Sequence, residues 1–151
     1  MGEKERDEIR ILAGLGLKAR LLVWARMRSD DIVQCLGLGL SFADLSIPVS
    51  FQQIRHKLKR DPEWVLQTIT ACVREAQDRG LSVCVGLEDA SRADRDFLMR
   101  VVETAQHAGA VRVRFADTVG IMEPFGVLEI MQTLRANTDP DIEMHPTTTS
   151  A

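Results

Sequence analysis

Short apolar runs alternate with longer helix-like segments along the whole of this 151-residue chain. The short runs, which we interpret as strands, are residues 20–24, 42–49, 81–87, 110–116 and 141–144. Between them, apolar residues recur at helical spacing in segments 3–15, 30–38, 62–79, 94–108 and 123–137. Strands joined by helices must be parallel, because each helical crossover returns the chain to the same end of the sheet. The pattern predicts an α/β fold with about five parallel strands, either an open doubly wound sheet or part of a (β/α)8 TIM barrel.

Several classes of function are disfavoured by the sequence. No GxGxxG or GxxxxGK[ST] turn follows a predicted strand, which argues against a nucleotide-binding sheet. The composition is 45% hydrophobic and 27% charged with a net charge of −3, which fits a globular protein and favours neither nucleic-acid nor membrane binding. The charged N-terminus predicts no secretory signal. The three cysteines, Cys35, Cys72 and Cys84, form no CxxC pair, so we expect a reducing, cytoplasmic location.

Polar residues follow three of the predicted strands. They are residues 88–92 (EDASR) after the third strand, residues 117–120 (DTVG) after the fourth, and His145 in the fifth. Barrel enzymes place their chemistry at the carboxyl ends of the strands, and carboxylates, a hydroxyl and an imidazole there suit a metal or acid–base site. Plainer roles remain open: helix caps, a turn at Gly120 and a structural histidine.

The alternation of side chains along a strand makes two further predictions. Gly86 and Ala116 should lie beneath the polar strand ends, where small side chains would leave room for a substrate. Arg114 and Glu143 should share that inner face, and since a lone buried charge is costly we predict an ion pair between them. Trp24 and Trp64 are most simply core or helix-packing residues. The basic run at residues 55–60 is expected to be a solvated helix end, with contact to an acidic ligand as the weaker alternative.

The polar segments together resemble a known family. Residues 85–92 (VGLEDASR), 115–120 (FADTVG) and 142–145 (IEMH) are similar to the homocitrate and 2-isopropylmalate synthase family, and most of all to its nitrogen-fixation branch. The resemblance extends over residues 1–145. It implies a (β/α)8 barrel that condenses acetyl-CoA with a 2-oxo acid at a divalent metal, Mg²⁺, Mn²⁺ or Zn²⁺. In this branch the acid is 2-oxoglutarate, the product is homocitrate for the nitrogenase cofactor, and a homo-oligomer is expected.

The resemblance also implies roles for individual residues. Carried over by position, the catalytic residues are Glu88 and Thr118, and the metal ligand is His145. Three further motif members are expected to bind substrate or support the site, namely Asp89, Arg92 and Asp117.

The sequence departs from the family pattern at both ends. The family's opening strand, with its arginine and metal-binding aspartate, is absent, as is the last strand. Pro146 and Thr147 follow His145, so the family's His-x-His is broken. Cys84 and Gly86 stand where lysine-pathway homocitrate synthases carry arginine and serine. We therefore expect a truncated barrel that is inactive by itself. A related lyase, a 2-isopropylmalate synthase and a non-catalytic subunit completed by a second polypeptide are the alternatives.

The last six residues, 146–151, do not fit the family. The usual continuation, Ala-His-Asn-Asp-Leu-Gly, written in GC-rich codons and read after loss of its first base, gives Pro-Thr-Thr-Thr-Ser-Ala. This matches the tail at every position. We therefore interpret residues 146–151 as the product of a frameshift, which sequencing of the genomic DNA tests directly.

Overall fold

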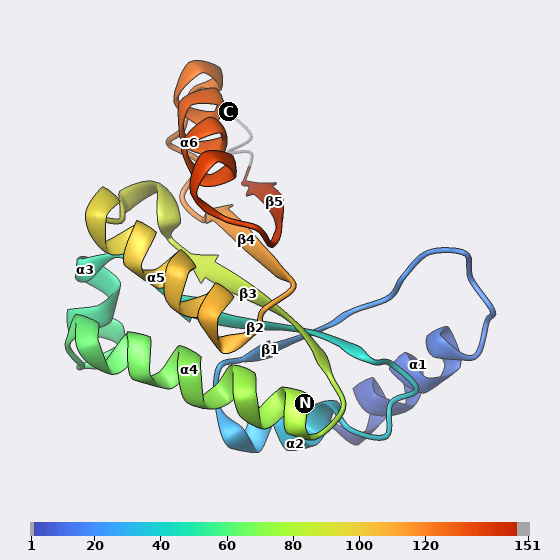
Figure 1. Ribbon diagram of the computed structural model, residues 1–151. Helices are drawn as coiled ribbons and strands as arrows, with labels where there is room; N and C mark the ends of the chain where they lie inside the picture. Colours follow the sequence, from blue (N-terminus) through green and yellow to red (C-terminus); the bar gives the residue numbers. More distant parts are fainter. Residues whose placement is uncertain (1, 148–151) are drawn as a thin grey trace.

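A five-stranded parallel sheet forms the centre of the computed structural model, which describes residues 2–147 (Figure 1). The strands lie side by side in chain order: β1 (Val23–Arg26), β2 (Phe42–Pro48), β3 (Ser82–Glu88), β4 (Arg112–Asp117) and β5 (Asp141–Pro146). Every neighbouring pair is parallel, as the sequence predicts. A strand order that never reverses is that of a barrel wall, whereas a doubly wound sheet reverses its order. The fold is thus an incomplete TIM-type barrel.

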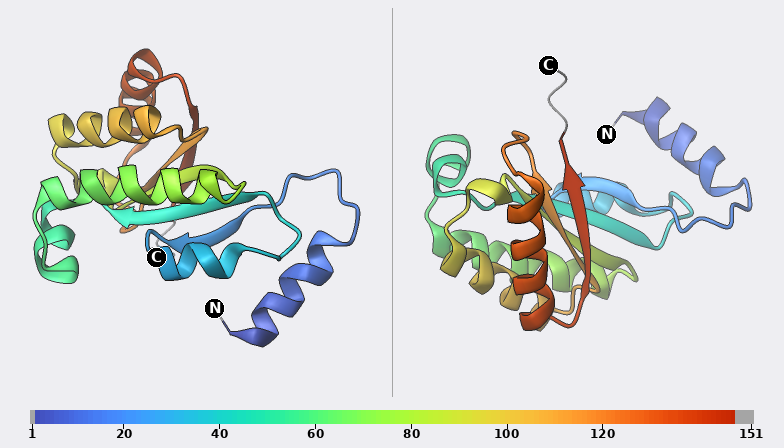
Figure 2. Two further views of the ribbon diagram at one scale, coloured as in Figure 1. Left: turned by 60° about the horizontal axis from the view of Figure 1, so that its bottom comes forward. Right: turned by 90° about the horizontal axis from the view of Figure 1, so that it is seen from above.

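Helices cover one face of this sheet (Figures 1 and 2). They are α2 (Ser29–Cys35), α4 (Pro62–Asp78), α5 (Arg95–Ala108) and α6 (Pro124–Asn137). Local sequence sets their ends: Asp61 caps α4 by accepting the Trp64 N–H at 2.8 Å, and Asp94 caps α5 by accepting the Phe97 N–H at 2.9 Å. Helix α5 ends at Gly109, whose φ of 99° an L side chain rarely adopts.

Shorter helical pieces complete the chain. Helix α1 (Glu3–Ala13) has no buried residue and is joined to the end of α2 by Arg6, which donates to the Gln34 carbonyl at 2.9 Å. After β2 come α3 (Phe51–Gln53) and the π-helical turn η1 (Ile54–Leu58), and after β3 the 3₁₀ turn η2 (Ala90–Arg92). No helix in the described part of the chain is long and apolar enough to cross a membrane.

The helix-facing side of the sheet is hydrocarbon. Its strand residues are buried against α4 and α5; they include Leu45, Ile47, Val83, Val85, Leu87, Val113 and Phe115. Burying each such side chain contributes about 1.5–3 kcal/mol, so this layer supplies most of the stability of the fold.

The opposite, inner face is polar. Strand register places Ser46, Gly86, Arg114 and Glu143 in one row across β2 to β5, and partners in a parallel register share a face. Trp24 belongs to this face too and is 53% exposed, so its placement in the core was wrong. Its indole is amphipathic, and Nε1 donates to Ser46 Oγ at 2.9 Å.

The tail enters the structure only in part. Pro146 ends β5, and the Thr147 N–H donates to the Asp117 carbonyl at 3.3 Å. Residues 148–151, which belong to the segment interpreted as a frameshift product, lie outside the described residues.

Candidate functional site

Three neighbouring strand ends carry the residues singled out from the sequence. Glu88 ends β3, Thr118 directly follows β4, and His145 is the next-to-last residue of β5. The Asp89 N–H donates to Thr118 Oγ1 at 2.8 Å, which joins the ends of β3 and β4. His145 pairs in register with Ala116, two residues before Thr118. We call this edge, formed by Glu88, Asp89, Thr118 and His145, the polar rim.

One member of the polar rim, Asp89, has a buried carboxylate. Asp89 is fully buried, and its oxygens accept hydrogen bonds from Arg92 Nε at 2.8 Å and Arg92 Nη2 at 2.7 Å. The Ser50 hydroxyl donates to the same carboxylate. Sequence reasoning did not identify Ser50; its available signal was a polar residue directly after the apolar β2 segment.

Glu88 has a cationic neighbour from another loop. Lys57 Nζ, on the turn η1, donates to Glu88 Oε2 at 3.0 Å. Part of the basic run expected to be only solvated therefore reaches the polar rim. Within residues 2–147 no other group donates to the Glu88 carboxylate, so Oε1 is available to a ligand.

Asp117 plays a local role in the loop before α6. Its carboxylate accepts the backbone N–H of Met122 at 2.9 Å and of Ile121 at 3.2 Å. Burial acts to raise the pKa of Asp117, but the hydrogen bonds that its carboxylate accepts from the backbone N–H groups of Ile121 and Met122 oppose this, and the pKa lies below its ordinary value. The carboxylate is on the helix-facing side of β4, and its contacts stabilise the turn.

Beneath the polar rim, the inner face holds a chain of alternating charges. Arg114 Nε donates to Glu143 Oε1 at 2.8 Å, which confirms the predicted ion pair. Arg114 also pairs with the fully buried Asp44, and Arg112 donates to Glu143 at 3.2 Å. Burial raises the pKa of Asp44, while the Arg114 charge opposes that rise. The network fixes the floor of the inner face.

The space beside Gly86 is not free for a substrate, contrary to the expectation from its small size. A Cβ built on Gly86 would lie 2.6 Å from Asp44 Oδ1 and closer still to Ser46 Oγ. Gly86 therefore makes room for the Asp44 and Ser46 side chains.

The described residues do not make up a metal site by themselves. The resemblance seen in the sequence implies a divalent metal at the strand ends. Among residues 2–147, however, no three His, Cys, Asp or Glu side chains lie close enough to hold one. The exposed His145 provides a single imidazole, and a closed or catalytic site needs at least about three protein ligands.

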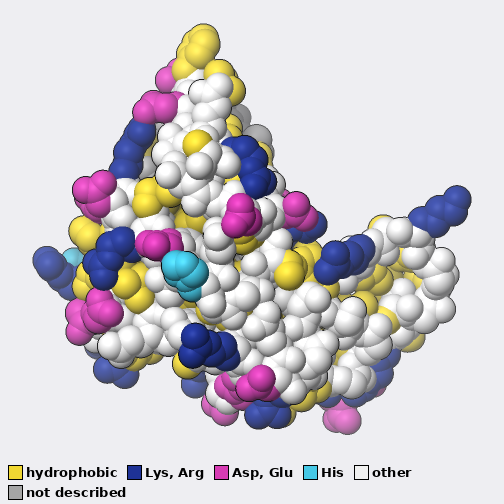
Figure 3. All heavy atoms as spheres, viewed as in Figure 1, with side chains coloured by type: hydrophobic (Ala, Val, Ile, Leu, Met, Phe, Trp, Pro, Cys, Tyr) yellow, Lys and Arg dark blue, Asp and Glu magenta, His cyan; other side chains and the backbone are white. Residues whose placement is uncertain are grey.

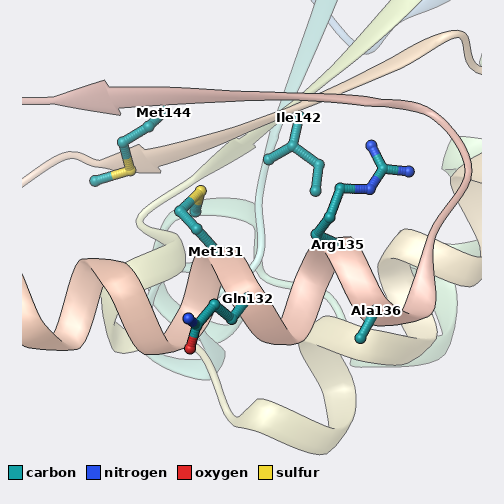
Figure 4. A pocket seen from close by; sticks show the side chains of 6 residues that line it. All are labelled: Met131, Gln132, Arg135, Ala136, Ile142 and Met144. Atoms are coloured by element: carbon teal, nitrogen blue, oxygen red, sulfur yellow. The ribbon is translucent and has the colours of Figure 1, made fainter.

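A hollow lies between α6 and β5, away from the polar rim (Figure 4). It has a volume of about 620 Å³ and is lined by Met131, Gln132, Arg135, Ala136, Ile142 and Met144. Ile142 and Met144 point from β5 toward the helix, on the face opposite the inner network (Figure 4). The hollow is an unfilled end of the apolar layer and is separate from the polar rim.

The fold is that of an incomplete β/α barrel, and the polar rim lies at the carboxyl ends of its strands. The family model described as HMGL-like matches residues 1–149. The chain belongs to the HMGL-like family.

Curated relatives share about two-fifths of its residues. The chain is 41% identical over 145 residues to 2-isopropylmalate synthase 2 of Caldanaerobacter subterraneus, 39% identical to homocitrate synthase subunit alpha of Clostridium pasteurianum, and 41% identical to homocitrate synthase 1 of Nostoc. These matches cover 96% of the chain but only 38%, 54% and 38% of the relatives. The chain thus spans about half, or less, of the length of these proteins.

Solved structures agree on the fold. An HMG-CoA lyase of Bacillus subtilis superposes with a TM-score of 0.76 at 17% identity, covering 92% of this chain and 49% of that one. An HMG-CoA lyase of Brucella melitensis gives a TM-score of 0.74 at 14% identity, covering 93% and 52%. The likeness at this identity concerns the barrel architecture.

Proposed function

We propose that this chain is part of a homocitrate synthase-type acyltransferase, which condenses acetyl-CoA with 2-oxoglutarate to give homocitrate and CoA. The observation that carries the proposal is the position of Glu88, Thr118 and His145 at three adjacent strand ends, in a chain about 40% identical to homocitrate synthases. The nitrogen-fixation role and a cytoplasmic location belong to the same proposal. The free, buried cysteines suit a reducing compartment.

In the proposed reaction a base removes a proton from the acetyl methyl group, and the resulting carbon nucleophile attacks the ketone of the oxo acid. Water then hydrolyses the thioester bond, which releases homocitrate and CoA. We assign Glu88 as the catalytic carboxylate, oriented by Lys57 and open at Oε1. Thr118 is the second catalytic residue, because its hydroxyl accepts the Asp89 N–H and can donate its own proton to a substrate oxygen. We assign supporting roles to Asp89, Arg92 and Asp117: Arg92 holds the Asp89 carboxylate, and Asp117 holds the loop that follows Thr118.

His145 is proposed as one ligand of a divalent metal whose other ligands lie outside the described residues. When bound, such a metal would polarise the ketone of the oxo acid. Because His145 is the only contribution assigned to this chain, we expect the 151-residue polypeptide to show no turnover with acetyl-CoA and 2-oxoglutarate.

The test uses the genomic reading frame with one base restored at the codon after His145. We expect its product to release CoA and to form homocitrate, identified by mass spectrometry. Glu88→Gln and Thr118→Val should each lower kcat/KM by about 100-fold or more, as expected for loss of a catalytic group. No product with any 2-oxo acid, or homocitrate formed by the unrepaired chain, would count against the proposal.

Two relatives support specific alternatives. The 41% identity to a 2-isopropylmalate synthase makes 2-oxoisovalerate the second candidate acceptor, and preference for it over 2-oxoglutarate in the same assay would select that function. The relative named as a subunit alpha supports a chain completed by a second polypeptide. Co-purification with another barrel protein that restores activity would select this reading.

A further inference from the structure

Asp89 has a backbone conformation that L residues rarely adopt. Its φ of 59° and ψ of 34° lie in the left-handed region, which favours glycine or asparagine. Its carboxylate is fully buried and is held from two directions, by Ser50 from the end of β2 and by Arg92 from the turn η2. A strained residue with so many partners at the edge of a candidate site calls for a functional explanation.

The left-handed backbone determines where the Asp89 N–H points. It is directed at Thr118 Oγ1, at 2.8 Å. A threonine hydroxyl has one hydrogen, so when its oxygen accepts the Asp89 N–H, its own hydrogen remains to be donated. Within residues 2–147 no group accepts that hydrogen, and Thr118 is exposed at the polar rim.

We propose that Asp89 is a positioning residue, whose carboxylate, locked by Ser50 and Arg92, keeps the Thr118 hydroxyl oriented as a donor toward a carboxylate or ketone oxygen of the oxo acid. The inference rests on the proposed function for the identity of the ligand. It assigns to Asp89 no contact with the substrate. The Asp89 carboxylate acts on Thr118 through the Asp89 backbone N–H: fixing the carboxylate fixes the direction of that N–H, which in turn fixes the Thr118 hydroxyl.

The first arm of the test needs no ligand. Amide hydrogen exchange is measured by NMR on the 151-residue chain. Thr118→Val removes the acceptor, and we expect the Asp89 amide to exchange at least about tenfold faster while the amides of Val85 and Leu87 are unchanged. Thr118→Ser should restore the protection. General loosening of the fold would raise the exchange rates of all three amides together. An unchanged exchange rate of the Asp89 amide in Thr118→Val would overturn the proposal.

The second arm changes the lock itself. Asp89→Gly keeps the left-handed backbone accessible but removes the carboxylate, whereas Asp89→Asn keeps one acceptor oxygen. We expect the amide of residue 89 to lose more protection against hydrogen exchange in Asp89→Gly than in Asp89→Asn. Ser50→Ala and Arg92→Lys weaken the hydrogen bonds to the Asp89 carboxylate without altering residue 89. They replace the Asp89 variants in this measurement if either of those fails to fold. Asp94→Asn, at the cap of α5, is the matched control and should leave the amide unaffected.

The third arm adds 2-oxoglutarate and Mg²⁺ to the frame-restored protein and follows the Thr118 resonances. We expect binding to weaken about tenfold in Asp89→Gly and to be unchanged in Asp94→Asn, since one donor to the ligand is misdirected. Equal binding by wild type and Asp89→Gly would overturn the positioning role. If the amide results hold but neither 2-oxoglutarate nor 2-oxoisovalerate binds the frame-restored wild-type protein in the presence of Mg²⁺, the ligand assignment and the proposed function are wrong, whereas the geometry of the Thr118 donor stands.

Discussion

The two faces of the sheet differ in how their side chains are stabilised. On the helix-facing side, residues such as Val85 and Phe115 are buried among hydrocarbon from α4 and α5. On the inner side, Asp44, Arg114 and Glu143 depend on one another for charge compensation. Hydrophobic burial is non-directional and is shared among many neighbours, whereas a buried ion pair fails when either partner is removed. The helix-facing side should therefore tolerate the exchange of one apolar side chain for another of similar size, whereas the inner side should not tolerate the loss of one partner of its ion pairs.

The largest expected effect is on the helix-facing side. Phe115→Ala removes a side chain that is 1% exposed and leaves a cavity, which should lower the free energy of unfolding by about 3–5 kcal/mol. Phe115→Leu should cost about 1.5 kcal/mol or less, because it nearly preserves volume. Urea denaturation followed by circular dichroism measures both. A loss below about 1 kcal/mol for Phe115→Ala would remove the basis of the comparison.

On the inner face, Arg114→Met should cost about 3 kcal/mol, because it leaves the buried Asp44 carboxylate without its partner. The comparison is sharpened by the double variant Arg114→Met with Asp44→Asn. Since the second change removes the uncompensated charge, it should recover much of the lost stability in the same denaturation assay. Additive losses in the double variant would show that the two side chains do not form a unit.

A smaller loss of stability is expected at Gly86, where β3 lies against the Asp44 and Ser46 side chains of β2. Gly86→Ala should lower stability by about 1–3 kcal/mol, because the new methyl group meets Asp44 and Ser46. Gly126→Ala, on helix α6, is the matched control: its Cβ would meet only Met122 Cε at 3.6 Å, and it should be neutral or stabilising by up to about 1 kcal/mol. Equal effects at the two sites would contradict the crowding at Gly86.

The smallest expected effect concerns pH and the polar end of the helix-facing side. Asp117→Asn should cost about 1 kcal/mol at neutral pH, since the two loop N–H groups bond different carboxylate oxygens and asparagine keeps only one oxygen. The pKa of Asp117 lies below its ordinary value, so its stabilisation is present above the unfolded-state pKa and is lost as pH falls through the folded-state pKa. The difference in Tm between wild type and Asp117→Asn should therefore shrink on acidification. A difference that grows would reverse this assignment.

Periodicity and strand parity were sufficient for the sheet, the polar rim and the pair between Arg114 and Glu143, because these depend only on spacing along neighbouring strands. The contacts of Lys57 with Glu88 and of Ser50 with Asp89 join residues 31 and 39 positions apart. Such contacts depend on how a loop folds back, which periodicity does not encode. The exposure of Trp24 was missed for a related reason, since the residue type alone does not indicate which face of the sheet a tryptophan occupies.

The sheet ends at β1 on one side and β5 on the other, and within residues 2–147 no strand pairs with either outer edge. Hydrophobic side chains are exposed near β5, on the arm formed by α6 (Figure 3), where Phe125 is 75% exposed. Because β1 and β5 run in the same direction, the outer edge of one molecule can accept the opposite edge of another without reversal. Such head-to-tail association gives a ring where its rotation closes and an open polymer where it does not, so purified chains should form larger assemblies as concentration rises.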